Sequence, residues 1–159
     1  MKKLLFTLVL SFLACVSFAQ IKSVDAKIDY RAGVFGPKGD AGAGLGVTIE
    51  LSEKIDFAPR FNWYMVSDGT RFTAEADLHY NLTEISDDFY LYPLLGAGVY
   101  HYNWKDTESH NHNKVLINAG CGIGYPLNEY FTVFGEAKYQ IIAGEDSDTY
   151  FSAGISYCF

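Results

Sequence analysis

Polar and apolar residues alternate with a period of two along most of the chain after residue 20. In the first such stretch, Asp25, Lys27, Asp29 and Arg31 alternate with apolar residues. This alternation is typical of a β-strand with one face in apolar surroundings and the other in polar surroundings. The pattern predicts strands near residues 24–34, 43–51, 55–65, 71–80, 89–102, 115–124, 131–141 and 151–159.

The segment 89–102 has an ambiguous facing, because apolar residues occupy both of its alternating sets. Proline lacks an amide hydrogen, so Pro59 and Pro93 predict a bulge or local irregularity in their strands. Turn residues separate the segments, most clearly in the stretch Gly36-Pro37-Lys38-Gly39-Asp40. The expected connections are loops near 36–41, 66–70, 103–113 and 143–148 at one end, and turns near 52–54, 83–88 and 126–129 at the other.

Eight alternating segments with short connections predict an all-β fold, an eight-stranded antiparallel up-and-down transmembrane β-barrel. After residue 20 no apolar stretch approaches the roughly 20 residues of a membrane-spanning helix. A soluble lipocalin-like binding protein would alternate in the same way with its faces reversed. Two features favour the membrane barrel: glycines crowd the polar face, and aromatic residues gather near the ends of the apolar face.

The first twenty residues indicate export, because Lys2 and Lys3 precede an apolar run and small residues precede Gln20. Cleavage after Ala19 removes a signal peptide, residues 1–19, and leaves one domain of 140 residues, 20–159. Loss of Lys2 and Lys3 changes the formal net charge from −7 to −9, which argues against a nucleic-acid partner. Cys121 and Cys158 are expected on opposite faces, as free thiols.

The chain resembles the small outer-membrane β-barrel (porin-like) domains of the OmpA, OmpX and opacity-protein superfamily. The resemblance covers the signal peptide, the eight segments, the stretch Phe89-Tyr90-Leu91-Tyr92-Pro93-Leu94 and the final strand. It implies a bacterial outer-membrane location, with outer-membrane lipid and lipopolysaccharide as surroundings and the barrel assembly machinery as a partner. The assembly signal of such proteins is a terminal aromatic residue with apolar residues at alternate positions before it, here Phe151, Ala153, Ile155, Tyr157 and Phe159.

Eight strands enclose a lumen only wide enough for side chains to fill, so the polar face predicts a plugged barrel. The charged residues expected to meet there are Lys27, Asp29, Arg31, Glu50, Arg60, Glu75, Asp77, Glu136 and Lys138. The main hypothesis is therefore a barrel with a structural or surface-interaction role, whose partner the sequence does not name. The alternative is a narrow gated pore, in which rearranged ion pairs admit small solutes or ions.

Two further kinds of site have weaker support in the sequence. Asp106, Glu108, His110 and His112 are metal-ligand types in the longest loop, but their spacing matches no closed site. A lipid A-modifying enzyme would need a nucleophile beside an oriented base, and Ser109 with His110 offers no evident third group. We therefore expect no catalytic activity and no cofactor.

Overall fold

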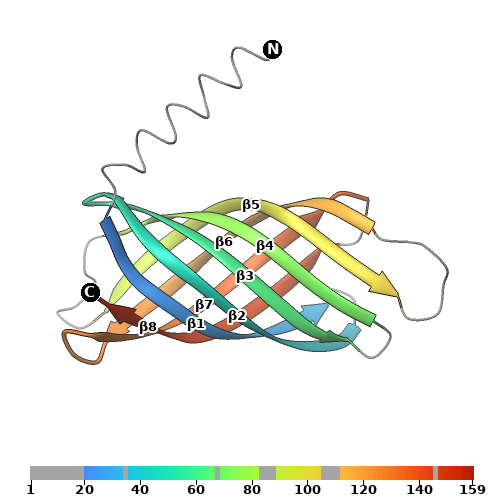
Figure 1. Cartoon of the computed structure of the whole chain (residues 1–159), viewed down its shortest axis with the longest axis horizontal. Helices are drawn as coiled ribbons and strands as arrows, with labels where there is room; N and C mark the ends of the chain where they lie inside the picture. Colours follow the sequence, from blue (N-terminus) through green and yellow to red (C-terminus); the bar gives the residue numbers. More distant parts are fainter. Residues whose placement is uncertain (1–19, 34–35, 67–68, 83–88, 105–111, 145–146) are drawn as a thin grey trace, which may run out of the picture.

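The computed structural model describes residues 20–33, 36–66, 69–82, 89–104, 112–144 and 147–159. Eight β-strands account for most of these residues (Figure 1). They are β1 (Gln20–Gly33), β2 (Gly36–Ser52), β3 (Ile55–Val66), β4 (Gly69–Tyr80), β5 (Tyr90–Trp104), β6 (His112–Pro126), β7 (Phe131–Ile142) and β8 (Asp148–Cys158). The expected signal peptide, residues 1–19, lies outside the described residues.

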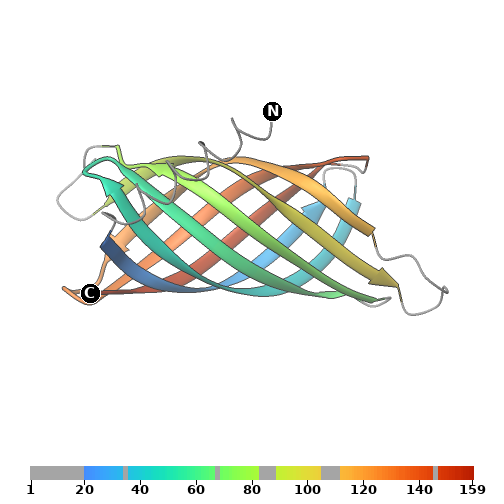
Figure 2. The same cartoon turned by 45° about the horizontal axis from the view of Figure 1, so that its top comes forward.

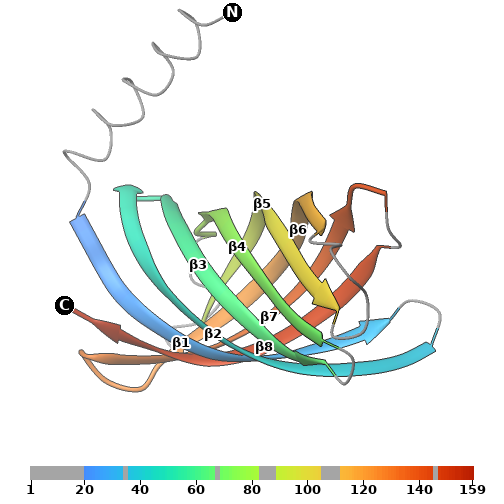
Figure 3. The ribbon, with the colours of Figure 1, turned by 45° about the vertical axis from the view of Figure 1, so that its right-hand side comes forward.

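The strands form one closed barrel in sequence order, and every neighbouring pair is antiparallel. β1 closes the barrel against β8, with Ser23 opposite Cys158 and Gly33 opposite Asp148. The start of β1 and the end of β8 therefore lie at the same end of the barrel, which we call the terminal mouth (Figures 1 and 3). The opposite end, where β1 is followed by β2, is called the loop end. All strands run at a strong tilt to the barrel axis (Figure 2), as barrel closure requires.

The connection after β1 differs from the sequence prediction. A turn was expected over Gly36–Asp40, but β2 begins at Gly36, and Gly36 and Asp40 pair with Gly33 and Arg31 of β1 across a shift in register. β3 joins β2 only from Ala41 onward, so this first part of β2 has no partner on the β3 side. Pro37 is tolerated there because an edge position does not require its missing amide hydrogen.

The two strand prolines produce less disturbance than predicted. Pro59 pairs with Ala76, and Pro93 with Cys121, without a shift in register. The effect of Pro59 is limited to the β2 side, where Val47 and Thr48 are not paired in register with β3 between the pairs Gly46–Arg60 and Ile49–Phe57. The register shifts in the described β1–β2 and β2–β3 pairings lie elsewhere, at the strand ends.

The alternation predicted from the sequence has its apolar face outward. Ile28 and Leu45 are 68% and 67% exposed on the outer surface, whereas Asn62 and Asp77 inside are fully buried. A soluble barrel of the lipocalin type has the reverse arrangement, so that alternative is wrong. The two thiols also lie as predicted, Cys121 exposed on the outer face and Cys158 at the terminal mouth.

The structure resolves the facing of β5. Tyr92, Leu94 and Tyr100 point into the barrel, and Leu95 and Val99 point outward. The register explains this choice, because Tyr90 and Tyr92 pair with Gly124 and Gly122 of β6. A side chain at either glycine would collide with the tyrosine ring beside it. The glycines of β6 therefore make room for two inward aromatic rings.

Aromatic residues lie on the outer surface towards both ends of the barrel. At the terminal mouth Phe131 and Phe159 both contact Tyr157, with ring centroids 5.4 and 5.3 Å apart. Nearer the loop end Phe72 stacks on Phe61 and on His101. Two such belts are typical of barrels that cross a membrane. Among the described residues, no helix is long and apolar enough to cross a membrane.

Candidate functional site: the barrel lumen

The inward side chains form three successive zones along the barrel. A cavity occupies the terminal mouth, ionic residues fill the middle, and aromatic and aliphatic side chains fill the region nearer the loop end. Each strand contributes alternate residues to these zones because its side chains point alternately inward and outward. The charged middle zone is the part that the sequence predicted.

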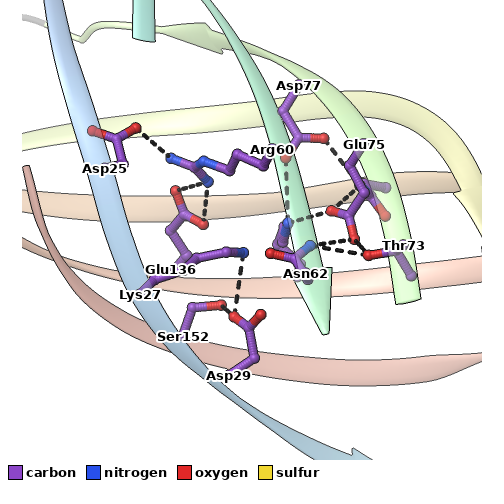
Figure 4. A network of polar contacts seen from close by, with 12 residues as sticks. Asp25, Lys27, Asp29, Arg60, Asn62, Thr73, Glu75, Asp77, Glu136 and Ser152 are labelled. Carbon is purple, nitrogen blue, oxygen red and sulfur yellow. Dashed lines mark hydrogen bonds and ion pairs between the residues drawn. The ribbon is translucent and has the colours of Figure 1, made fainter. Parts of the chain in front are cut away.

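One ionic cluster is centred on Arg60 of β3 (Figure 4). Its Nη1 lies 2.6 and 2.7 Å from the two carboxylate oxygens of Glu136 on β7. Its Nη2 lies 3.7 Å from Asp25, which also accepts hydrogen bonds from Ser23 and Thr48. Tyr92 donates to Glu136 at 3.0 Å. This cluster links β1, β2, β3, β5 and β7 across the lumen.

The second cluster is centred on Glu75 of β4. Lys138 lies 2.7 Å from Glu75 and 3.3 Å from Asp77. Glu75 also accepts hydrogen bonds from four uncharged side chains, those of Asn62, Thr73, Asn118 and Gln140. Such donors compensate a buried carboxylate for the water it loses.

A third ion pair joins two residues of β1. Lys27 Nζ lies 3.2 Å from Asp29, and Ser152 of β8 donates a hydrogen bond to the same carboxylate (Figure 4). With Asp25 included, five buried carboxylates face three buried cations in the three groups. The negative excess explains why hydroxyl and amide donors converge on the carboxylates.

The structure brings together seven of the nine charges predicted for the lumen: Lys27, Asp29, Arg60, Glu75, Asp77, Glu136 and Lys138. Glu50 does not join them. It is exposed near the end of β2, where the register with β3 shifts. The side chain of Arg31 lies outside the described part of the chain.

The alternation in the sequence did not predict that side chains nearer the loop end close the lumen. Arg71 is buried there, with its guanidinium carbon 4.7 Å from the ring centre of Tyr64 and one nitrogen 2.8 Å from Asp40. Tyr64 contacts Tyr150 edge to face, with ring centroids 5.5 Å apart. Tyr100, Leu116 and Ile142 form a small apolar core beside them. The sequence feature that could have predicted this core is the pair Leu116 and Ile142. Both are apolar residues at positions where the alternation places inward-facing side chains.

The terminal mouth is hollow. A cavity of about 620 Å³ lies there, lined by polar residues such as Asp56 and His79 and by the aromatic residues Tyr90, Tyr92 and Phe134. Arg60 and Asp25 form part of its lining. The cavity therefore ends at the first ionic cluster.

The structure adds no support for the metal-binding and catalytic residues considered from the sequence. Asp106, Glu108 and His110 lie outside the described residues, as do Ser109 and the side chain of His112. Among the residues that are described, no group of three His, Cys, Asp or Glu side chains is placed to hold a metal ion.

Solved structures with the same barrel exist at low sequence identity. Neisserial surface protein A matches with a TM-score of 0.68 and 14% identity, over 89% of this chain and 99% of that one. The N-terminal barrel domain of Pseudomonas aeruginosa OprF matches with a TM-score of 0.61 and 18% identity, over 87% and 98%. The attachment invasion locus protein Ail of Yersinia pestis matches with a TM-score of 0.60 and 16% identity, over 89% and 98%.

These matches show that the chain has the fold of small eight-stranded outer-membrane barrels. No family model and no curated protein sequence matches the chain. Identities below 20% show the fold alone, because one fold can serve many functions.

Proposed function

We propose that the chain is an integral protein of the bacterial outer membrane, with a structural or surface-interaction role and a lumen closed by its own side chains. The observation that carries the proposal is the inverted barrel: large apolar residues cover the outside and paired charges fill the inside. Exposure of that outer surface to water costs free energy, whereas its contact with the hydrocarbon of a membrane is favourable.

Three further features support the outer-membrane assignment. The N-terminal stretch 1–19 has the layout of a signal peptide. The final strand has the alternating apolar pattern, ending in Phe159, that resembles an assembly signal. Two proteins with the same fold are described as a surface protein and an attachment invasion locus protein. Outer-membrane lipid, lipopolysaccharide and the assembly machinery are the partners proposed on this basis, without a catalytic role.

The burial of large side chains nearer the loop end supports a closed lumen. Tyr64, Arg71 and Tyr150 are at most 1% exposed in the zone nearer the loop end. The ionic clusters lie between this zone and the terminal mouth, so a solute would meet two barriers in succession. A narrow gated pore is the second candidate, because the ion pairs of the lumen could in principle exchange partners.

The two candidates are separated by the variant Arg60→Ala, studied for stability and for conductance in planar lipid bilayers. Removal of Arg60 leaves Glu136 and Asp25 without their cation, which typically costs about 3 to 5 kcal/mol for a buried pair. We expect this loss of stability, with no conductance in either the parent chain or the variant. Discrete channel openings that increase in Arg60→Ala would instead establish the gated pore and refute the closed structural barrel.

A further inference from the structure

The cavity at the terminal mouth has an aromatic wall and a polar wall. Phe89, Tyr90, Tyr92 and Phe134 contribute the rings, and Tyr90 and Tyr92 stack with centroids 5.9 Å apart. Lys22, Asp56, His79 and Asn81 contribute the polar side. A concave site with apolar walls and a few convergent polar groups is the usual form of a small-molecule site.

Asp56 is the anchor of the polar wall. Its side chain is 5% exposed, and its Oδ2 accepts hydrogen bonds from Lys22 at 2.9 Å and Asn81 at 2.8 Å. Its other oxygen, Oδ1, is buried with no hydrogen-bond partner among the described residues. A buried carboxylate oxygen without a donor is costly, so this position favours a ligand that donates hydrogen bonds.

His79 lies directly opposite Asp56 in the pairing of β3 with β4. Its ring stacks on Tyr92, with centroids 4.7 Å apart, and its Nε2 is also buried without a partner among the described residues. A neutral imidazole can accept a hydrogen bond at one nitrogen. Two unsatisfied atoms that can accept hydrogen bonds thus belong to neighbouring strands in the lining of one cavity.

Lys22 already places an ammonium group at this carboxylate. Its side chain is 43% exposed, unlike the lumen cations Lys27 and Lys138, whose side chains are 2% exposed. Because the Lys22 side chain is largely exposed, its ammonium can move into solvent when another ammonium takes its place at the buried Asp56 carboxylate. Arg60, by contrast, is already engaged by Glu136 on both carboxylate oxygens.

We propose that the terminal mouth binds a small primary amine with an apolar or aromatic body, whose ammonium group replaces that of Lys22 at Asp56. An ammonium carries three hydrogens, so it can donate to the Asp56 carboxylate and still have hydrogens for a further acceptor. The body of the ligand lies against the tyrosine and phenylalanine rings, which also attract a cation. An anionic ligand is disfavoured at this position, because it would lie against the Asp56 carboxylate, whose Oδ1 has no hydrogen-bond donor among the described residues.

The experiment compares two probes of the same shape, 2-phenylethylamine and the uncharged 2-phenylethanol. The chain is folded in micelles of an uncharged detergent, and binding is followed by NMR from the His79 ring and Asn81 amide signals. We expect the amine to bind at least tenfold more tightly than the alcohol. Asp56→Asn should remove most of that difference, and Lys22→Met should strengthen amine binding severalfold by removing the internal competitor.

The matched control is Lys54→Met, which removes a lysine from the same cavity lining but not the one paired with Asp56. It should leave amine binding within about twofold of the parent chain. Each variant is first checked by gel electrophoresis for a folded form whose mobility changes on boiling, so that misfolding is not mistaken for a loss of binding. Equal binding of the two probes, or amine binding unchanged in Asp56→Asn, would overturn the proposal without affecting the closed-barrel function.

Discussion

Individual buried charges account for much of the lumen's architecture. Glu75 accepts hydrogen bonds from donors on β3, β4, β6 and β7, so a single carboxylate ties together strands far apart in the sequence. Such an arrangement is stabilising only while it is complete, because each buried charge depends on its partners. The charge types could be predicted from the sequence. The amide residues that complete the clusters could not, because alternation gives the face of a residue but not its partner across the barrel.

Lys138→Met tests the contribution of a single buried charge to stability. The substitution retains an apolar stem of similar length but leaves Glu75 and Asp77 without their shared cation, 2.7 and 3.3 Å away in the parent chain. We expect the free energy of unfolding, measured by urea titration in lipid vesicles, to fall by about 3 to 5 kcal/mol.

Lys54→Met serves as the comparison, since Lys54 lies exposed in the turn between β2 and β3. A surface substitution of this kind typically changes stability by no more than about 0.5 kcal/mol. Equal stability of the two variants would mean that the Glu75 cluster does not hold the strands together.

The strands show which parts of the sequence pattern were informative. Where charges alternate with apolar residues, as in β1 and β4, the predicted faces are confirmed. In β5 both faces are apolar, and the facing depends on the glycines of β6, which lie next to it only in the folded barrel. The stretch Gly36–Asp40 was wrongly predicted as a turn because glycine and proline are also tolerated at an unpaired strand edge.

The outer face of β2 provides a test of membrane depth. Leu45 lies in the middle of the strand and is 67% exposed, and it pairs with Ala26 and Phe61 on either side. If this surface faces hydrocarbon, Leu45→Arg should destabilise the barrel in vesicles by about 2 to 4 kcal/mol. The measurement is again urea unfolding of the vesicle-bound protein.

The same substitution at Leu127 is the control. Leu127 is 53% exposed but lies in the turn between β6 and β7, at the terminal mouth. Near a membrane interface the cost of arginine falls to about 0 to 1 kcal/mol. An equal loss of stability at both positions would contradict the prediction that the middle of β2 faces the hydrocarbon of a membrane.

The whole molecule is asymmetric along its axis. Its lumen is packed with aromatic and aliphatic side chains nearer the loop end and hollow at the terminal mouth. Eight strands and their faces follow from the period of two, so the barrel itself could be predicted from the sequence. The hollow mouth could not, because it depends on how Tyr90, Tyr92 and Phe134 fill the space left by glycines on neighbouring strands.

The most direct test of the inverted barrel is its behaviour in lipid and in water. The chain is folded into lipid vesicles and compared by gel mobility and far-ultraviolet circular dichroism before and after boiling. We expect a β-rich form that migrates anomalously until it is boiled, and that does not form in buffer without lipid or detergent. A monomer that folds in plain buffer would contradict the membrane barrel, because an outer surface that carries Ile28, Leu45 and Phe61 could not then be facing a membrane.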